Sequence, residues 1–183
     1  MQADLDLPLG VEIKRAAADI SNVMPSGVFE GYASLFGLID AGRDEVVPGA
    51  FAASLARRGA SGVKMLWQHR AAEPIGQWTA IGEDRRGLRV TGRLNLAVAR
   101  AREVLALMRE RAVDGLSIGF KAGRSAIDRK TGIRRLYAVD LWEISVVTFP
   151  MLPQARITAV KDAGGDERRL LRALIEGARL MSS

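Results

Sequence analysis

The chain has 183 residues, of which 48% are hydrophobic and 26% are charged. These proportions are ordinary for a globular protein with one domain and a buried core. The chain contains no cysteine, which excludes disulfide scaffolds, thiolate metal sites and thiol proteases. Its one histidine, His69, excludes metal sites built from several histidines. We therefore expect neither a metal nor another cofactor.

The net charge at pH 7 is +6, which permits a nucleic acid or an acidic protein as partner. Solvated helix surfaces explain the same charge, and no recognised nucleic-acid motif is present. No apolar run approaches the roughly 18 residues of a membrane span, and the first residues lack the apolar region of a secretory signal. We expect a cytoplasmic protein with no membrane and no specific nucleic acid among its partners.

In chain order, the first half is predicted to form mainly strands, because its β-branched and aromatic residues partly alternate with polar ones. One short helix interrupts them, with Pro48 suited to its first turn and Gly59 to its end. The predicted elements are a strand at 11–17, a strand at 27–37, a loop at 38–47, the helix at 48–59, strands at 63–70 and 75–81 joined by a short polar link at 71–74, and a strand at 87–96.

The second half begins with the clearest helix, at 97–113, which Asn95 is expected to cap and Gly115 to end. Two strands are predicted after it, at 117–126 and 132–149. One side of the helix carries an apolar stripe at spacings of three and four, formed by Val98, Ala101, Leu105, Met108 and Ala112.

The last residues are predicted to be a separate unit. Residues 162–167 contain a Gly-Gly pair and are expected to be a linker, and 168–180 are expected to form a basic amphipathic helix. This gives a main domain at 1–161 and a linker with a helix at 162–183. The fold class is α+β, with a mainly antiparallel β-barrel or sheet and flanking helices.

Ser117 is the candidate nucleophile, because it lies at the centre of the pattern G-x-S-x-G at 115–119. The nucleophile elbow of the α/β-hydrolases is excluded, since here a helix precedes the serine and the only histidine lies upstream. A serine hydroxyl still needs a base, and His69 is the only imidazole available. We expect Gly115 to adopt a positive φ at the helix end, and Gly119 to leave room for a substrate carbonyl.

A histidine base needs an acceptor that fixes its tautomer, and Glu143 is the candidate. It stands in an apolar strand, where a carboxylate is costly unless it is paired with His69 or with an arginine. Strict alternation puts Glu143 on one face of the strand and the alternative, Asp140, on the other. Residues expected to share the face of Glu143 are Leu141, Ser145, Val147 and Phe149.

Five blocks in this order resemble the prohead proteases of tailed phages of the Hong Kong phage type and of gene transfer agents. The blocks are GYASLFG, DEVVPGAF, MLWQH followed by PIGQW, GLSIGF and LWEISVVTFP, between about residues 27 and 157. The resemblance implies a fold similar to herpesvirus assemblin. It also implies a serine endopeptidase that acts inside the assembling procapsid, where it removes the scaffolding segment of the major capsid protein and cuts itself.

Motif by motif, the resemblance assigns the nucleophile to Ser117, the base to His69 and the acidic member to Glu143. Assemblins use a second histidine in the acidic position, which this chain lacks. For the oxyanion hole, the N–H of Ile118 is one candidate and Arg156 a weaker one. The relation to assemblin also suggests a homodimer.

Two other functions remain open. One is a non-catalytic assembly protein that binds the scaffold through its basic surface and C-terminal helix. The other is a basic nucleic-acid-binding module. Shortening of the capsid protein on co-expression, abolished by Ser117→Ala, would separate the protease from the assembly protein.

Overall fold

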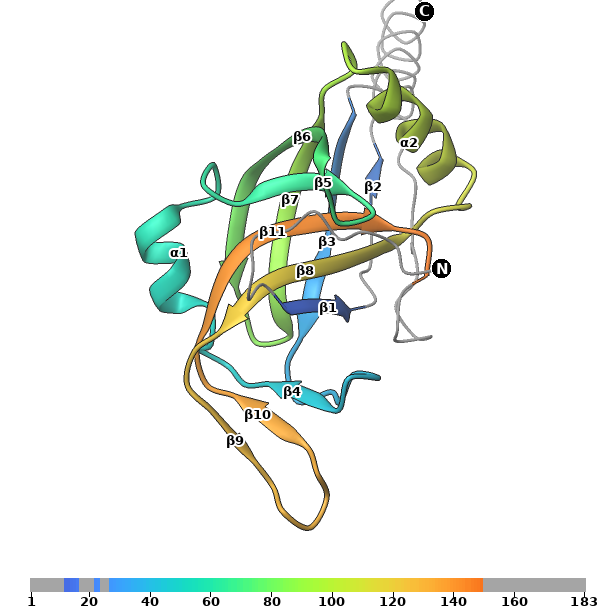
Figure 1. Ribbon diagram of the computed structural model, residues 1–183. Helices are drawn as coiled ribbons and strands as arrows, with labels where there is room; N and C mark the ends of the chain where they lie inside the picture. Colours follow the sequence, from blue (N-terminus) through green and yellow to red (C-terminus); the bar gives the residue numbers. More distant parts are fainter. Residues whose placement is uncertain (1–11, 17–21, 24–26, 150–183) are drawn as a thin grey trace, which may run out of the picture.

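The computed structural model describes residues 12–16, 22–23 and 27–149, and side chains from residue 27 onward. They form a strongly curled sheet, a small second sheet and two helices (Figure 1). In chain order the elements are β1 Glu12–Ala16, β2 Asn22–Val23, β3 Val28–Leu35, β4 Asp44–Val46, α1 Ala52–Arg58, β5 Lys64–Trp67, β6 Arg70–Glu83, β7 Gly87–Leu94, α2 Ala99–Arg109, β8 Gly115–Ala122, β9 Ser125–Ile127, β10 Arg134–Leu136 and β11 Val139–Val147.

The larger sheet has eight strands in the order β1-β8-β11-β5-β6-β7-β3-β2, and the smaller has three in the order β4-β10-β9. All neighbours are antiparallel except the pairs β11–β5 and β10–β4. The curl brings β8 against β3, although these strands do not pair (Figure 1). The predicted α+β class with a mainly antiparallel sheet and flanking helices is confirmed.

The hydrophobic core fills the inside of the curl. Alternate residues of β8, namely Leu116, Ile118 and Phe120, are fully buried there and pack with Phe29 and Leu88. Their neighbours Ser117 and Gly119 therefore lie on the other face of the sheet. In α2 the buried residues are Ala101, Val104, Leu105 and Met108, which confirms the centre of the predicted stripe.

Both helices are shorter than predicted, because turns replace their first and last residues. Helix α2 starts after Val98, while the side chain of Asn95 accepts the N–H of Ala97 in the preceding turn. It ends at Arg109, and Arg111 has a positive φ of 58°. Gly59 does follow α1 with a φ of 62°. Of the described helices, neither could cross a membrane.

Three strand predictions were wrong in detail, each because pairing with a distant strand sets the local structure. The expected loop at 38–47 contains β4, which pairs with β10. The expected link at 71–74 belongs to β6. The single strand expected at 132–149 is divided into β10 and β11. The linker and helix expected at 162–180 lie outside the described residues.

Candidate active site

Ser117 lies in the middle of β8, between two paired strands. It is opposite Arg15 of β1 on one side and Ser145 of β11 on the other. Its side chain is fully buried. This position in the sheet puts Ser117 on the same face as Gly119 and beside the strand that carries Glu143.

His69 lies in the two-residue loop of the β5–β6 hairpin, between the paired residues Trp67 and Arg70. Gln68 and His69 both have positive φ, 52° and 61°. Two-residue hairpin loops with positive φ at both positions usually contain glycine or asparagine, because the left-handed region costs other residues about 1–2 kcal/mol each. The chain thus holds its only histidine in a strained turn.

Contacts with β11 and with Thr148, the residue after it, hold this turn in place. The N–H of Gln68 donates to the carbonyl of Val146 at 3.1 Å, and its side-chain amide donates to Thr148 Oγ1 at 2.6 Å. The N–H of His69 donates to Ser145 Oγ at 3.1 Å. Because β5 runs parallel to β11, the turn at the end of β5 lies against the C-terminal half of β11.

Glu143 projects toward this turn because β11 contains a bulge. Leu141 is opposite Phe120 and Glu143 is opposite Gly119, so Trp142 is the extra residue. The bulge puts Glu143 on the face of Ser117 and leaves Leu141 on the core face. The expectation that Glu143 and Leu141 share a face was therefore wrong.

The bulge also overturns the predicted separation of the two acidic residues. Asp140 is opposite Lys121, two residues from Gly119, so Asp140 and Glu143 lie on the same face. They differ in their partners and in their exposure. The side chain of Asp140 is 28% exposed, whereas that of Glu143 is 2% exposed.

His69 and Glu143 form a buried pair. Nδ1 of His69 lies 2.7 Å from Oε1 of Glu143. Ser145 Oγ donates to the second carboxylate oxygen, Oε2, at 2.6 Å. Because an ionised carboxylate is only an acceptor, a neutral imidazole in this contact carries its proton on Nδ1 and has its lone pair on Nε2. Nε2 is buried and has no hydrogen-bond partner in the described structure. The contact with Glu143 thus fixes one ring nitrogen and leaves the other, Nε2, as the atom that can accept a proton.

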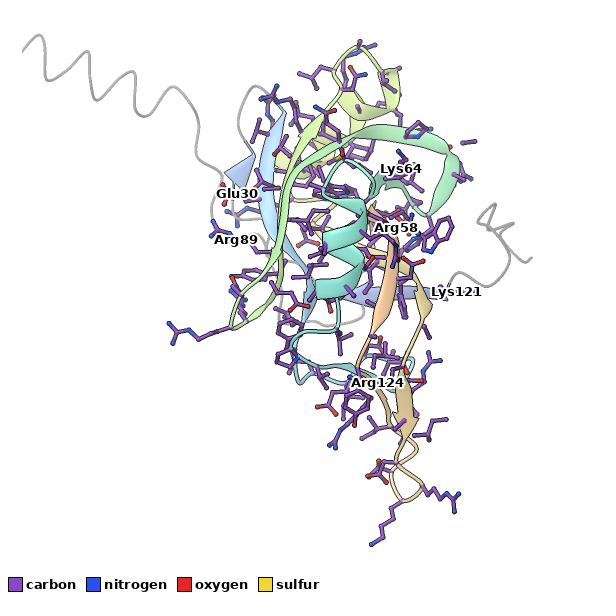
Figure 2. All side chains as sticks on the ribbon, turned by 90° about the vertical axis from the view of Figure 1, so that its left-hand side faces the viewer. Glu30, Arg58, Lys64, Arg89, Lys121 and Arg124 are labelled. Carbon is purple, nitrogen blue, oxygen red and sulfur yellow. The ribbon has the colours of Figure 1, made fainter. Side chains whose placement is uncertain are left out.

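Asp140 forms ion pairs with arginines of α1 and not with His69. The guanidinium of Arg58 binds both of its carboxylate oxygens, at 3.1 and 3.0 Å, and Arg57 also pairs with it. The indole N–H of Trp142 donates to it at 3.0 Å. The hydrogen bonds from Arg58 are the main cause of its lowered pKa. Figure 2 shows Arg58 at α1, and its guanidinium lies 4.3 Å from the ring centre of Trp142.

The two glycines around Ser117 have other roles than those predicted. Gly115 is the first residue of β8 and is not among the described glycines with positive φ. At Gly119, a Cβ atom would lie 2.2 Å from Oε1 of Glu143. The room left by Gly119 is therefore filled by the Glu143 side chain and not open to a substrate.

The described structure does not show either predicted candidate as the donor of an oxyanion hole. Ile118 is paired with Lys14 on one side and Ile144 on the other, so its N–H faces a neighbouring strand. Arg156 lies outside the described residues. Sequence reasoning missed Ser145, Gln68 and Thr148. Alternation did put Ser145 on the face of Glu143, but nothing distinguished it from other buried serines.

Other features of the described residues lie apart from this pair. A pocket of about 560 Å³ lies between β6, β7 and the start of α2, and its lining includes Gln77 and Arg93 but not His69, Ser117 or Glu143. No group of three or more metal-binding side chains occurs in the part of the chain that the structure describes.

Comparison with known proteins connects this geometry to a family. The chain is 38% identical over 145 residues to the prohead protease of Enterobacteria phage HK97, which covers 77% of this chain and 63% of that protein. It is 33% identical over 116 residues to the capsid polyprotein of Pseudomonas phage PAJU2, which covers 60% of this chain and 17% of the polyprotein. The matches thus span less than two thirds of either relative.

The fold has a solved counterpart. The capsid assembly protease of bacteriophage T4 superposes with a TM-score of 0.56 over 76% of this chain and 98% of that chain, at 12% sequence identity. The family model of the Caudovirus prohead serine proteases matches residues 12–167. This range includes the paired His69 and Glu143, Ser117 and every described strand. The chain therefore belongs to the Caudovirus prohead serine protease family.

Proposed function

We propose that this protein is a serine endopeptidase in which Ser117 is the nucleophile, His69 the general base and Glu143 the residue that orients His69. The observation that carries the proposal is the buried contact of 2.7 Å between His69 Nδ1 and Glu143 Oε1, with no hydrogen-bond partner for Nε2 among the residues that the structure describes. A serine hydroxyl is a poor nucleophile unless a base removes its proton during attack. A neutral imidazole with its lone pair on Nε2 is a suitable base.

In the proposed reaction, Ser117 Oγ attacks the carbonyl carbon of a peptide bond and its proton moves to His69 Nε2. Glu143 stabilises the imidazolium that forms. His69 then gives the proton to the leaving amine, which leaves an acyl ester on Ser117. A water molecule, deprotonated by the same imidazole, attacks the ester and releases the acid product.

The proposed substrate is the scaffolding segment of the major capsid protein, cleaved inside the assembling procapsid, with the chain itself as a second substrate. Two observations support this assignment: membership of the prohead protease family, and similarity to part of a protein named as a capsid polyprotein. We also infer a homodimer, by analogy with the assemblins. Light scattering coupled to size-exclusion chromatography would measure its mass, and a monomer at working concentration would contradict the dimer.

Co-expression with the neighbouring major capsid protein tests the function. We expect the capsid protein to be shortened at one site, and full-length capsid protein to accumulate with Ser117→Ala. Ser125→Ala removes an exposed serine of β9 and serves as the matched control, which should cleave normally. Mass spectrometry of the product identifies the site. A capsid protein that stays intact with the wild type, or is still cut with a folded Ser117→Ala variant, would contradict the proposal.

A further inference from the structure

Ser145 is the residue that connects the two halves of the His69–Glu143 pair. Its hydroxyl donates to Glu143 Oε2 at 2.6 Å and accepts the backbone N–H of His69 at 3.1 Å. A serine hydroxyl can donate one hydrogen bond, and here the acceptor of that bond is the carboxylate. Ser145 is fully buried, so water does not compete for these bonds. It also lies directly opposite Ser117 in the sheet.

We propose that Ser145 is a positioning residue that fixes the orientation and the tautomer of His69. This inference rests on the proposed function, since it assigns a further residue to the same site. Ser145 acts on both groups that determine the imidazole geometry: the carboxylate that accepts the Nδ1 proton, and the strained backbone from which the ring projects. It does not itself touch the reacting atoms.

The physical reason is that each of these groups would otherwise lose a buried hydrogen bond. Without the hydroxyl, Oε2 of Glu143 has no donor from Ser145, and the carboxylate is free to turn away from Nδ1. The N–H of His69 also loses its acceptor, so the left-handed turn is held less firmly. Both changes allow the ring to place its proton on Nε2, a tautomer that cannot accept the proton of Ser117.

The chain contains a matched control for this substitution. Ser54 of α1 is also buried, accepts a backbone N–H from β11 (Leu141, 2.9 Å) and donates to a carboxylate (Asp140, 3.4 Å). It has the same pattern of bonds but no contact with the His69 turn among those described. Ser54→Ala therefore removes similar bonds without disturbing the pair.

The first test is independent of activity. Because the chain has one histidine, the ring nitrogen signals of a protein without an affinity tag come only from His69. We would record them by ¹⁵N NMR above pH 7 in a Ser117→Ala background, which prevents self-cleavage. We expect a single Nδ1–H tautomer in the parent and after Ser54→Ala, and a mixture of tautomers after Ser145→Ala. An unchanged tautomer after Ser145→Ala would overturn the proposal.

The second test uses kinetics with Ser117 present, on a peptide spanning the site found by co-expression. We expect Ser145→Ala to lower kcat about 10- to 100-fold, the range of one or two lost hydrogen bonds, with little change in KM. Ser145→Thr keeps the hydroxyl and should recover most of kcat. Ser54→Ala should leave kcat at the wild-type value. Equal losses of kcat after Ser54→Ala and Ser145→Ala would show that Ser145 is merely structural.

If Ser145→Ala does not fold, Ser145→Cys takes its place, because it keeps the volume and offers only a weak donor. A folded Ser145→Cys protein with the parent tautomer and kcat would also overturn the inference. The two proposals fail separately. If the wild-type protein is as inactive as the Ser117→Ala variant, the proposed function is contradicted. The NMR result still decides the role of Ser145 in that case.

Discussion

The carboxylate of Glu143 is held from three sides. His69 binds one oxygen, Ser145 binds the other, and the backbone of Gly119 lies directly against the side chain. A buried charge is tolerated only with such partners. The same contacts leave the carboxylate a single orientation, which is what the orienting member of a triad needs.

Removing only the charge of this residue should affect catalysis far more than folding. We expect Glu143→Gln to lower turnover about 10⁴-fold, as in serine proteases where the amide selects the wrong histidine tautomer. Asp140→Asn should lose little, because Asp140 binds Arg57 and Arg58 and not His69. Peptide cleavage rates of the two purified variants provide the measurement. Large losses for Asp140→Asn alone would make Asp140 the acidic member.

Gly119 offers a second test, in which no polar group is removed. Gly119→Ala puts a Cβ 2.2 Å from Oε1 of Glu143, so the carboxylate must move. We expect a loss of about 100-fold in kcat, since displacements of about 1 Å have this effect. The free energy of unfolding should fall by about 1–3 kcal/mol from overpacking.

Gly82→Ala is the control for Gly119→Ala. Gly82 also lies in a strand, β6, but its Cβ would meet nothing within 4 Å. We expect unchanged kcat, and stability equal to the parent or higher by about 0.4–1 kcal/mol. Wild-type kcat for Gly119→Ala would mean that the position of Glu143 tolerates movement.

At the scale of elements, α1 is attached to the start of β11 through Asp140. Arg58 binds both carboxylate oxygens, and Ser54 donates to the carboxylate and accepts the N–H of Leu141. Leu141 directly precedes the bulge residue Trp142, on which Arg58 also stacks. These contacts fasten α1 to the start of β11, on the N-terminal side of the bulge, and none of them reaches Glu143 or the His69 turn.

This attachment predicts a pH-dependent stability. The pKa of Asp140 is lowered from the ordinary 3.8, first by the hydrogen bonds from Arg58, so its ionised form stabilises the folded state. Such stability is fully present above about pH 4 and is lost as the pH falls through the lowered pKa. We expect Asp140→Asn to lower the free energy of unfolding by about 1–2 kcal/mol at pH 7.

Urea unfolding of both proteins at several pH values measures this difference. The gap between wild type and Asp140→Asn should begin to narrow below about pH 4 and should close as the pH falls through the lowered pKa of the folded-state carboxylate. A gap that stays constant from pH 7 to pH 3 would assign the contribution to shape and not to charge.

Local sequence patterns predicted most elements, but not the bulge and the turn that orient the side chains of Glu143 and His69. Strands β3 and β7 and helix α2 follow simple periodicities and lie close to their predicted ranges. The bulge at Trp142 follows from pairing with β8, which no local pattern reveals. The left-handed turn at Gln68 and His69 could not be predicted, because it lacks the glycine or asparagine that is typical of such turns.

The candidate site was predictable where chemistry restricts the choice. The chain offers one histidine, and a carboxylate in an apolar strand needs a partner, so the contact between His69 and Glu143 could be anticipated. The supporting residue Ser145 could not, because its importance depends on two strands and a turn meeting in space. The roles of Ser117, His69 and Glu143 in catalysis remain predictions.

At the scale of the whole molecule, we propose that the C-terminal segment is dispensable for the chemistry. The Gly-Gly pair at 164–165 and the end of the resemblance to the prohead proteases near residue 157 suggest a boundary at about residue 161. We expect a chain truncated after Ala163 to keep the wild-type circular dichroism spectrum and to cleave a good peptide at the wild-type rate. An insoluble or inert truncated chain would place the segment in the catalytic domain.

The place of β11 in the sheet has a consequence for the time at which the site can form. It is the last described strand to be synthesised, yet it lies between β8 and β5. Before it inserts, no strand pairing links β8, which carries Ser117, to β5 and the turn that carries His69, and the carboxylate is missing. Pairings between distant segments are also slow to form. In a chain still growing on the ribosome, Ser117 and His69 are therefore not yet joined through β11, so the proposed active site forms only after β11 has been made.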